Sequence, residues 1–411
     1  MSSASTSPDS LREDMILKIK EAGYSLRADV EQALRSVERH VFVPGSSLEE
    51  AYANDIVVTK RGPDDQVLSC LSQPSIVALQ LEQLEVRRGH RVMEIGAGAG
   101  YNAALLARQA GPGGFVTTID VDADIVESAS DRLATAGVGN VQVVLGDGAL
   151  GYRPNGPYDR IVATVGAFGI PDAWLAQLTP TGRLVVPLRL RGSVSRSIAF
   201  ERCAEGVWRS VDHRMCGFVP LRNGVADDPR RVIPVTADRT VLLQLYQEHT
   251  MDPAGVVGVL DRPRSEVWTG VTYRPRESLE WLYLWLACVL DTSLCLLRVD
   301  PAAVDSGLVS PMFAQTTMAI PGPGGLAYLT WRLVDRTEDG GKIMEVGVVG
   351  HGVAGAELSG RVAEEIHAWS ERYRHCTVQF EIPSAGTGAS NRCSGRFFLD
   401  RPHRSLIAIW R

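Results

Sequence analysis

A short glycine turn is the part of this chain best suited to bind a cofactor. Residues 92–95 form an apolar run, residues 96–100 read Gly-Ala-Gly-Ala-Gly, and residues 102–109 have a helical pattern. A strand that turns tightly into a helix presents backbone N–H groups and a helix N-terminus to a ligand. The pattern predicts a cofactor site at Gly96, Gly98 and Gly100. A strand–helix turn without a ligand is the alternative interpretation.

The spacing of these glycines indicates the kind of cofactor. A dinucleotide fingerprint reads G-x-G-x-x-G and leaves room for a pyrophosphate, whereas here the third glycine comes one residue early and Tyr101 follows it. No lysine follows the turn, which excludes a P-loop. The turn is similar to motif I of S-adenosylmethionine-dependent methyltransferases. Their cofactor carries a sulfonium and an amino acid tail in place of phosphates.

Carboxylates follow the next two predicted strands. Residues 116–120 read as a buried strand that ends in Asp120, and an acid at this position can hold the two hydroxyls of a ribose. Residues 141–145 read as a third strand, followed by Asp147 and Gly148. A carboxylate there can accept a hydrogen bond from the amino group of adenine.

The elements that position these residues alternate along the chain. Strands are predicted at 92–95, 116–120, 141–145, 158–164 and 182–187, and helices at 102–109, 123–136 and 171–178. Such alternation predicts right-handed βαβ units and a mostly parallel, doubly wound sheet, which is the Rossmann-like α/β class. Ligands of such sheets bind beyond the carboxyl ends of the strands. Gly96, Asp120, Asp147 and Thr164 all fall at that edge.

Further motifs resemble the protein-L-isoaspartate (D-aspartate) O-methyltransferase family in kind and order. They are Val-Glu-Arg-His-Val-Phe-Val-Pro at 37–44, Ala-Tyr at 51–52, Leu-Ser-Gln-Pro-Ser-Ile-Val-Ala at 71–78, the turn at 94–101, Gly-Asp-Gly at 146–148, Pro-Tyr-Asp at 157–159 and Phe-Val-Pro-Leu at 218–221. The resemblance covers residues 20–222. It implies transfer of a methyl group from S-adenosyl-L-methionine to an aspartyl or isoaspartyl carboxylate of a peptide, with S-adenosyl-L-homocysteine as the product.

The resemblance, together with the strand-end pattern, gives a set of candidate site residues. For the cofactor these are Ser72, Glu94, Gly96, Gly98, Gly100, Asn102, Asp120, Val121, Asp147, Gly148 and Thr164, and for the substrate Cys70, Leu71, Val165 and Gly166. Methyl transfer to a carboxylate needs no general base, because a carboxyl group with a pKa near 4 is already ionised at pH 7. It needs an in-line approach and exclusion of water, and orientation can supply up to about 7–11 kcal/mol in the best model systems. The lack of a Ser-His-Asp or metal constellation is therefore expected.

Ser72 is the candidate catalytic residue. The resemblance places a hydroxyl here, close to the sulfonium and the acceptor carboxylate, and implies that it orients the carboxylate and is not a nucleophile. The alternative is that Ser72 caps the helix that starts near Pro74. The chain departs from the family nearby, with Ser69-Cys70 where Gln-Thr is usual and Asn54 where an acid is frequent. These changes alter the acceptor side and argue against simple isoaspartate repair.

The chain continues to residue 411, well past the segment at which the repair enzymes end. This length suggests two or three domains. We expect a disordered tail at 1–19, the catalytic domain at 20–222, a linker at 223–264 with a short helix at 241–249, and a separate α+β domain at 265–411. In that domain, strands are predicted at 266–273, 293–299, 327–334, 342–349, 376–382 and 405–410, and helices at 278–290 and 354–374.

Composition narrows the possible partners. The formal net charge is −6 and no basic patch stands out, so a nucleic acid partner is not expected. We find no signal peptide and no apolar run long enough for a bilayer. Seven cysteines without framework spacing suggest reduced thiols and a cytoplasmic location. The histidines and cysteines lack metal-ligand spacing, so no metal is expected, and the tryptophans of the second half read as core. The sequence does not indicate an oligomeric state.

Three functions remain open from the sequence. The first is methylation of an aspartate in a precursor or cyclised peptide, leading to aspartimide and isoaspartate. It follows from a resemblance to the C-terminally extended family members of ribosomal peptide natural-product pathways, of the lanthipeptide (FxLD) and graspetide types. The second is protein-L-isoaspartate repair with a decorated C-terminus. The third is a non-catalytic binding module with a cofactor fold.

Overall fold

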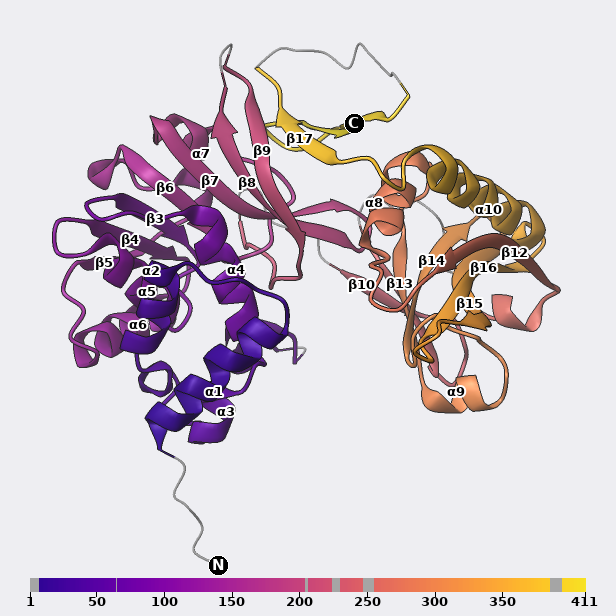
Figure 1. Ribbon diagram of the computed structural model, residues 1–411, viewed down its shortest axis with the longest axis horizontal. Helices are drawn as coiled ribbons and strands as arrows, with labels where there is room; N and C mark the ends of the chain where they lie inside the picture. Colours follow the sequence, from indigo (N-terminus) through magenta and orange to yellow (C-terminus); the bar gives the residue numbers. More distant parts are fainter. Residues whose placement is uncertain (1–6, 64, 204–205, 224–229, 247–254, 385–393) are drawn as a thin grey trace, which may run out of the picture.

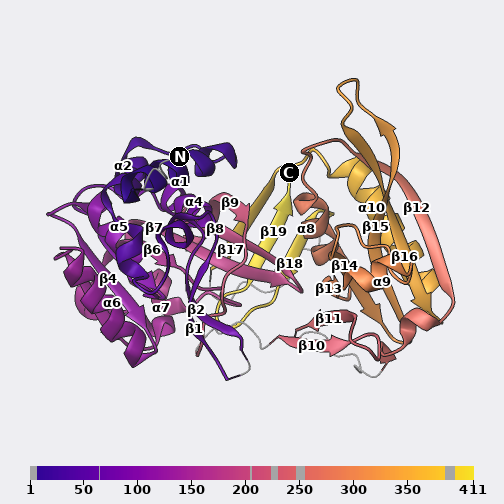
Figure 2. The same cartoon turned by 90° about the horizontal axis from the view of Figure 1, so that it is seen from below.

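Two large β-sheets organise the chain. The computed structural model describes residues 7–63, 65–203, 206–223, 230–246, 255–384 and 394–411. The first sheet lies in the half coloured indigo to magenta and the second in the orange half, and the yellow C-terminal strands lie against the first (Figure 1). Figure 2 shows the same arrangement from below, with β17, β18 and β19 between the two halves.

The first sheet has the predicted parallel core. Its parallel strands run in the order β5 (Val141–Leu145), β4 (Phe115–Asp120), β3 (Arg91–Ile95), β6 (Tyr158–Ala163) and β7 (Leu178–Arg191), and β8 (Val194–Arg202) and β9 (Trp208–Met215) continue it antiparallel. The helices of this part are α4 (Pro74–Leu84), α5 (Tyr101–Ala110), α6 (Ala123–Thr135) and α7 (Asp172–Ala176). Val92, Met93 and Ile95 are fully buried, as expected for a parallel strand covered on both faces. The predicted α/β class is confirmed.

The N-terminal segment is a helix where we expected a tail. α1 (Pro8–Glu21) begins with Ser7, whose side chain accepts a hydrogen bond from the Ser10 N–H, and it buries Met15, Ile16 and Ile19. The expectation of disorder is therefore wrong from residue 8 onward, because a capped start and a buried apolar stripe outweigh the Ser/Thr-rich composition. Residues 1–6 lie outside the described residues. α2 (Ala28–Ser36), the 3-10 turn η1 (Arg39–Phe42), α3 (Leu48–Tyr52) and the hairpin β1 (Val57–Arg61) and β2 (Val67–Leu71) follow.

The second sheet is antiparallel. Its order is β10 (Arg231–Pro234), β11 (Val241–Leu245), β13 (Cys295–Val299), β14 (Thr316–Gly322), β15 (Gly325–Arg336), β16 (Lys342–Gly352) and β12 (Arg264–Tyr273). It carries α8 (Glu280–Val289), α9 (Pro301–Asp305) and α10 (Gly355–Arg372), and α10 packs along β12, β15 and β16. The predicted elements between residues 264 and 374 are present with slightly shifted bounds.

The expected linker is part of this second sheet. β10 and β11 both lie within residues 223–264, and β11 is a strand where a short helix was predicted. β11 pairs with β10 on one side and with β13 on the other. The side chains of Val241, Leu243 and Leu245 are completely buried. Pairing on both sides thus decides the conformation of an apolar segment that is ambiguous in isolation. Residues 247–249 of the predicted helix lie outside the described part of the chain.

The last strands of the chain return to the first sheet. β17 (Val378–Ile382) pairs with β9, and β19 (Leu406–Trp410) and β18 (Arg396–Leu399) extend the sheet beyond it. The separate domain expected at 265–411 is therefore wrong in its C-terminal boundary. One continuous hydrophobic cluster includes Phe200 of β8, Trp285 of α8 and Phe380 of β17. The two halves consequently share a core.

A buried polar junction fixes the two halves together. Arg196 on β8 pairs with Glu280 on α8 at 2.9 Å, and its Nε donates to His213 Nδ1 at 3.0 Å. The other ring nitrogen of His213 donates to the Val378 carbonyl at 2.8 Å. Burial, and then the charge of Arg196, lowers the pKa of His213 to about 4. At physiological pH the neutral imidazole of His213 on β9 therefore bonds both β8, through Arg196, and β17, through Val378.

Phe380→Ala tests whether the halves unfold as one unit. Phe380 is fully buried, so we expect a loss of about 3–5 kcal/mol in the free energy of unfolding. Because β17 is paired to β9, amide hydrogen exchange in β7 and β8 should accelerate as well. The control is Val353→Ala at a position 91% exposed, which should change stability by no more than about 0.5 kcal/mol. Unchanged exchange in β7 and β8 would show that the C-terminal strands are independent.

Candidate active site

The glycine turn packs against the end of β6, as its sequence predicts. Gly96 has φ +99°, and a Cβ at this position would lie 2.7 Å from Thr164 Oγ1 and 2.9 Å from a methyl group of Val165. The Thr164 hydroxyl donates to the Gly96 carbonyl at 2.7 Å. Gly98 and Gly100 also have positive φ, at +50° and +88°. Only glycine is unstrained in such a turn, which lets a ligand approach the backbone closely.

The two predicted strand-end acids lie at the same edge of the sheet. Asp120 Oδ2 accepts a hydrogen bond from the Gly98 N–H at 3.2 Å. The pKa of this carboxyl group is raised, chiefly because the group is buried. Asp147 Oδ1 accepts the Ala149 N–H at 2.9 Å, directly after β5. Asp120 thus touches the glycine turn while Asp147 lies one strand further on. Val121 lies beside Asp120 and is half-buried.

Glu94 and Asn102 support the turn from within. The Glu94 carboxyl accepts from Asn102 Nδ2 at 2.7 Å and from the Thr118 hydroxyl at 2.6 Å, and it is completely buried. Burial raises the pKa of Glu94 to about 7. Asn102 Oδ1 is buried and has no hydrogen-bond partner among the described residues, so it can accept from a ligand.

The acceptor-side residues lie across the turn. A Cβ at Gly98 would lie 3.8 Å from both the Cys70 carbonyl and Ser69 Oγ, so β2 passes over the turn. Cys70 is half-buried, whereas the Leu71 side chain is only 3% exposed and belongs to the core of the N-terminal helices. Only the backbone of Leu71 is therefore available to a substrate. Gly166 donates its N–H to the Val219 carbonyl at 2.8 Å.

Ser72 stands between β2 and α4 and does not cap the helix. The N-cap residue of α4 is Gln73, and the Ser75 N–H and hydroxyl donate to Asn54 Oδ1 at 3.1 and 2.8 Å. The capping interpretation is wrong because Asn54 satisfies the helix start from another segment. The half-buried Ser72 hydroxyl makes no hydrogen bond within the described chain, which leaves it available to a bound carboxylate.

Sequence reasoning missed an ion-pair cluster beside Asp120. Arg222 donates both ends of its guanidinium to Asp122 at 3.0 and 2.8 Å and lies 3.9 Å from Asp120. Lys60 of the β1–β2 hairpin pairs with Asp122 and Asp124, each at 2.7 Å. The cluster joins the hairpin and the segment after β9 to the end of β4. Arg222 directly follows the Phe-Val-Pro-Leu motif, which is the one sequence signal that could have identified it.

The described residues contain no group of three or more acidic, histidine or cysteine side chains arranged to hold a metal ion. In the same part of the chain, no helix is both long and apolar enough to cross a membrane. All six cysteines for which the structure gives a position are free thiols, and Cys393 lies outside the described residues.

Comparison with known proteins identifies the family. The family model for protein-L-isoaspartate (D-aspartate) O-methyltransferase matches residues 10–226. The chain belongs to this family. A protein-L-isoaspartate O-methyltransferase of Methanopyrus kandleri is 36% identical over 51% of this chain and 90% of its own length. One of Rhodopseudomonas palustris is 38% identical over 50% of this chain and 82% of its own. A solved protein-L-isoaspartate O-methyltransferase is 21% identical, with a TM-score of 0.49 over 91% of this chain and 96% of that one.

As a member of the protein-L-isoaspartate O-methyltransferase family, the chain is an S-adenosylmethionine-dependent O-methyltransferase. The residues present fit that cofactor. The glycine turn has positive φ at Gly96, Gly98 and Gly100, Asp120 stands where an acid can bind a ribose, and Asn102 Oδ1 is an unsatisfied acceptor behind the turn. No lysine or arginine lies in the turn itself, in keeping with a cofactor that has no phosphates.

Asp120→Asn tests the ribose contact. Loss of a hydrogen bond to a charged group should weaken binding of S-adenosyl-L-homocysteine by about 1.5–3 kcal/mol, measured by titration calorimetry. The control is Asp159→Asn, since Asp159 also accepts a backbone N–H, from Arg91 at 2.9 Å, but at the opposite edge of the sheet. Equal losses in both variants would mean that the effect is one of folding and not of contact.

The pH dependence of stability tests the burial of Glu94. Its folded-state pKa of about 7 lies above the unfolded value, so its contribution is complete below pH 4.5 and is lost as the pH rises through 7. The loss should amount to about 3 kcal/mol by pH 8. Glu94→Gln should flatten this part of the curve in denaturant unfolding, while the exposed Glu127→Gln should follow the wild type. His213, whose pKa is lowered, changes stability in the opposite direction over part of this range, so the difference between the wild-type and Glu94→Gln curves is the measurement that decides. Parallel wild-type and Glu94→Gln curves between pH 5 and 8 would contradict the assignment.

Proposed function

We propose that this enzyme methylates the side-chain carboxylate of an aspartyl residue in a ribosomally made peptide, which the C-terminal half of the chain helps to bind. The observation that carries the proposal is the position of the turn between β18 and β19, which contains Pro402 and Arg404. A Cβ at Gly169 would lie 2.5 Å from the Pro402 carbonyl, and Arg404 pairs with Asp172. The loop after β6, which holds Val165 and Gly166, is thus in contact with residues outside the part of the chain that the family model matches, residues 10–226.

The contact between the loop after β6 and the C-terminal segment involves residues that the aligned relatives do not cover. Their alignments cover about half of this chain, and the family model matches residues 10–226, so the second sheet and the three returning strands lie outside the matched part. Binding energy gained away from the reacting atoms can be used to position them. An added surface beside the acceptor loop favours one dedicated peptide over the many damaged proteins that a repair enzyme must accept.

The chemistry requires positioning and no base. When bound, S-adenosylmethionine supplies an electrophilic methyl group on a positively charged sulfur. The carboxylate oxygen attacks that carbon in line, an O–C bond forms, and the C–S bond breaks with its electron pair on sulfur. Ser72 donates its hydroxyl to the carboxylate and orients it, while the β1–β2 hairpin over the turn excludes water. The charges of acceptor and donor are both lost in the step.

The ester explains why such a peptide would be methylated. The backbone nitrogen of the following residue attacks the ester carbonyl and forms a five-membered aspartimide, its proton leaving with methoxide as methanol. Methanol leaves far more readily than hydroxide leaves a carboxylate. Hydrolysis of the aspartimide then yields isoaspartate.

The proposal includes a cytoplasmic location, motivated by seven cysteines without disulfide spacing.

Isoaspartyl repair is the second candidate. It is supported by the printed names of the relatives, which are protein-L-isoaspartate O-methyltransferases. The two functions differ in the acceptor, because repair recognises an isoaspartyl carboxylate and the proposed function recognises an ordinary aspartyl one.

Methylation of matched peptides tests the proposal. The full chain is incubated with S-adenosylmethionine and either a synthetic isoaspartyl peptide or a short peptide encoded beside this chain's gene. Mass spectrometry should show addition of one methyl group to the second peptide, followed by loss of methanol. Efficient methylation of the isoaspartyl peptide, with ordinary aspartate ignored, would establish repair. Uptake of S-adenosylmethionine without methylation of either peptide would favour a binding module.

Ser72→Ala tests the role of its hydroxyl in the same assay. Loss of a hydrogen bond to a carboxylate should lower kcat/KM by a factor that corresponds to about 1.5–3 kcal/mol of transition-state stabilisation. Cofactor affinity and thermal stability should stay nearly unchanged. Ser75→Ala is the control, because Ser75 bonds Asn54 and should affect stability instead. Parallel losses of activity and stability in Ser72→Ala would assign it a structural role.

A further inference from the structure

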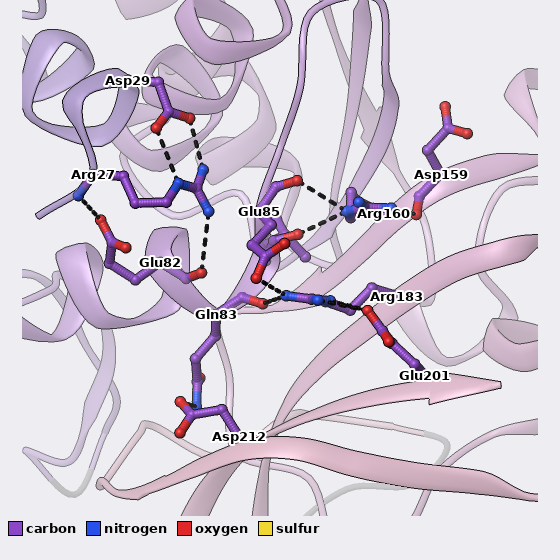
Figure 3. A network of polar contacts seen from close by, with 11 residues as sticks. Arg27, Asp29, Glu82, Gln83, Glu85, Asp159, Arg160, Arg183, Glu201 and Asp212 are labelled. Atoms are coloured by element: carbon purple, nitrogen blue, oxygen red, sulfur yellow. Dashed lines mark hydrogen bonds and ion pairs between the residues drawn. The ribbon is translucent and has the colours of Figure 1, made fainter. Parts of the chain in front are cut away.

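The two ends of helix α4 differ in how their charge is compensated. A helix carries partial positive charge at its N-terminus and partial negative charge at its C-terminus. At the C-terminal end, Arg160 donates to the Leu84 carbonyl at 2.7 Å. Arg183 donates to the Gln83 carbonyl at 2.8 Å (Figure 3). Arg183 is also paired with Glu85 and Glu201. Cations at the C-terminus of a helix stabilise it, and here Glu85 and Glu201 also compensate the charge of Arg183.

The N-terminal end of α4 carries a buried cation as well. Arg39 is fully buried, and its Nη2 donates to the Ser72 carbonyl at 2.7 Å and its Nε to the Ala51 carbonyl at 2.6 Å. Within the described chain no carboxylate pairs with Arg39, and its Nη1 has no hydrogen-bond partner. The Tyr101 ring lies 5.0 Å from the guanidinium carbon, and Tyr101 interacts with Arg39 as a neutral phenol, because burial raises the pKa of its hydroxyl.

Among the described residues, no carboxylate caps this end of α4. The first turn of α4 contains no acid, and its first free N–H is capped by the neutral side chain of Asn54. A buried guanidinium beside a helix N-terminus is unfavourable for the free protein, because both are positive and burial removes solvation. An anion that binds in front of Ser72 relieves both costs.

We propose that Arg39 is a positioning residue for the acceptor carboxylate, acting through the main chain of Ser72 and through its uncompensated buried charge. This inference rests on the proposed function, since it concerns the carboxyl group that becomes methylated. Arg39 fixes the peptide unit of Ser72 by hydrogen bonding and adds its charge to the N-terminal end of α4. The combined positive potential selects an ionised side chain over its neutral amide analogue.

The test compares charged and neutral peptides on two arginine variants. Binding of a synthetic isoaspartyl peptide, its aspartyl form and its asparaginyl form is measured on the full chain with S-adenosyl-L-homocysteine present. Arg39→Met should lower the preference for the charged peptides over the asparaginyl form by roughly tenfold or more. KM for the acceptor should rise more than kcat falls, and cofactor affinity should stay within about twofold of the wild type.

Two further variants separate charge from structure. Arg39→Lys keeps the charge, so it should retain most of the preference even where it destabilises the chain. Arg160→Met removes an arginine that is similarly buried, at 8% exposure, and also bonds backbone carbonyls, but at the other end of the helix. It should leave the preference unchanged.

The outcomes distinguish a failure of the role of Arg39 from a failure of the proposed function. An unchanged preference in Arg39→Met, in a wild-type background that methylates a carboxyl peptide, would overturn the role of Arg39 and leave the proposed function intact. A preference lost equally in Arg160→Met would also overturn it, because the effect would then come from general loosening of α4. A wild-type chain that binds charged and neutral peptides equally and transfers no methyl group would overturn the proposed function and this inference together.

Discussion

The pairing of β17 with β9 is the contact on which the position of the whole C-terminal half depends. It joins residues about 170 positions apart, with Arg209 opposite Glu381 and Trp208 opposite Ile382. The chain leaves the first sheet after β9, builds the second sheet, and returns to continue the first. Because backbone groups at an unpaired sheet edge need partners, the returning strands also cover the edge of β9. Residues of the C-terminal segment are consequently held against the segment that follows β6, where Arg404 pairs with Asp172, and are not free on a linker.

The shared core makes the geometry rigid where catalysis needs it. Trp285, Phe380 and Phe200 belong to one apolar cluster that extends to Ile161 and Ala163 on β6. The loop after β6, which carries Thr164 and Val165, therefore rests on packing contributed by both halves. The Arg196–His213 junction adds hydrogen bonds whose direction is fixed, so the halves have one preferred orientation.

The sequence predicted local features well and long-range ones poorly. The glycine turn, Asp120 and Asp147 were predictable because a glycine with positive φ and an acid at a strand end depend on a few adjacent residues. Helix α1 was missed because its start was read by composition and not by its Ser-Pro cap. β11 and the return of β17 could not be predicted, since both depend on partners far along the chain. Arg39 lies in a motif that identified the family, yet its role is visible only when the Ser72 carbonyl and the missing counter-charge are seen together.

The indirect position of Arg39 has a chemical reason. In this reaction an anionic oxygen and a cationic sulfur become a neutral ester and a neutral thioether, so charge decreases on the way to the transition state. A direct ion pair with the acceptor would stabilise the ground state more than the transition state and would slow the chemical step. A cation held behind the Ser72 peptide unit attracts the carboxylate into the site without a hydrogen bond to its attacking oxygen. In the proposed mechanism only the weaker Ser72 hydroxyl then contacts the nucleophile, which keeps the nucleophile oriented and reactive.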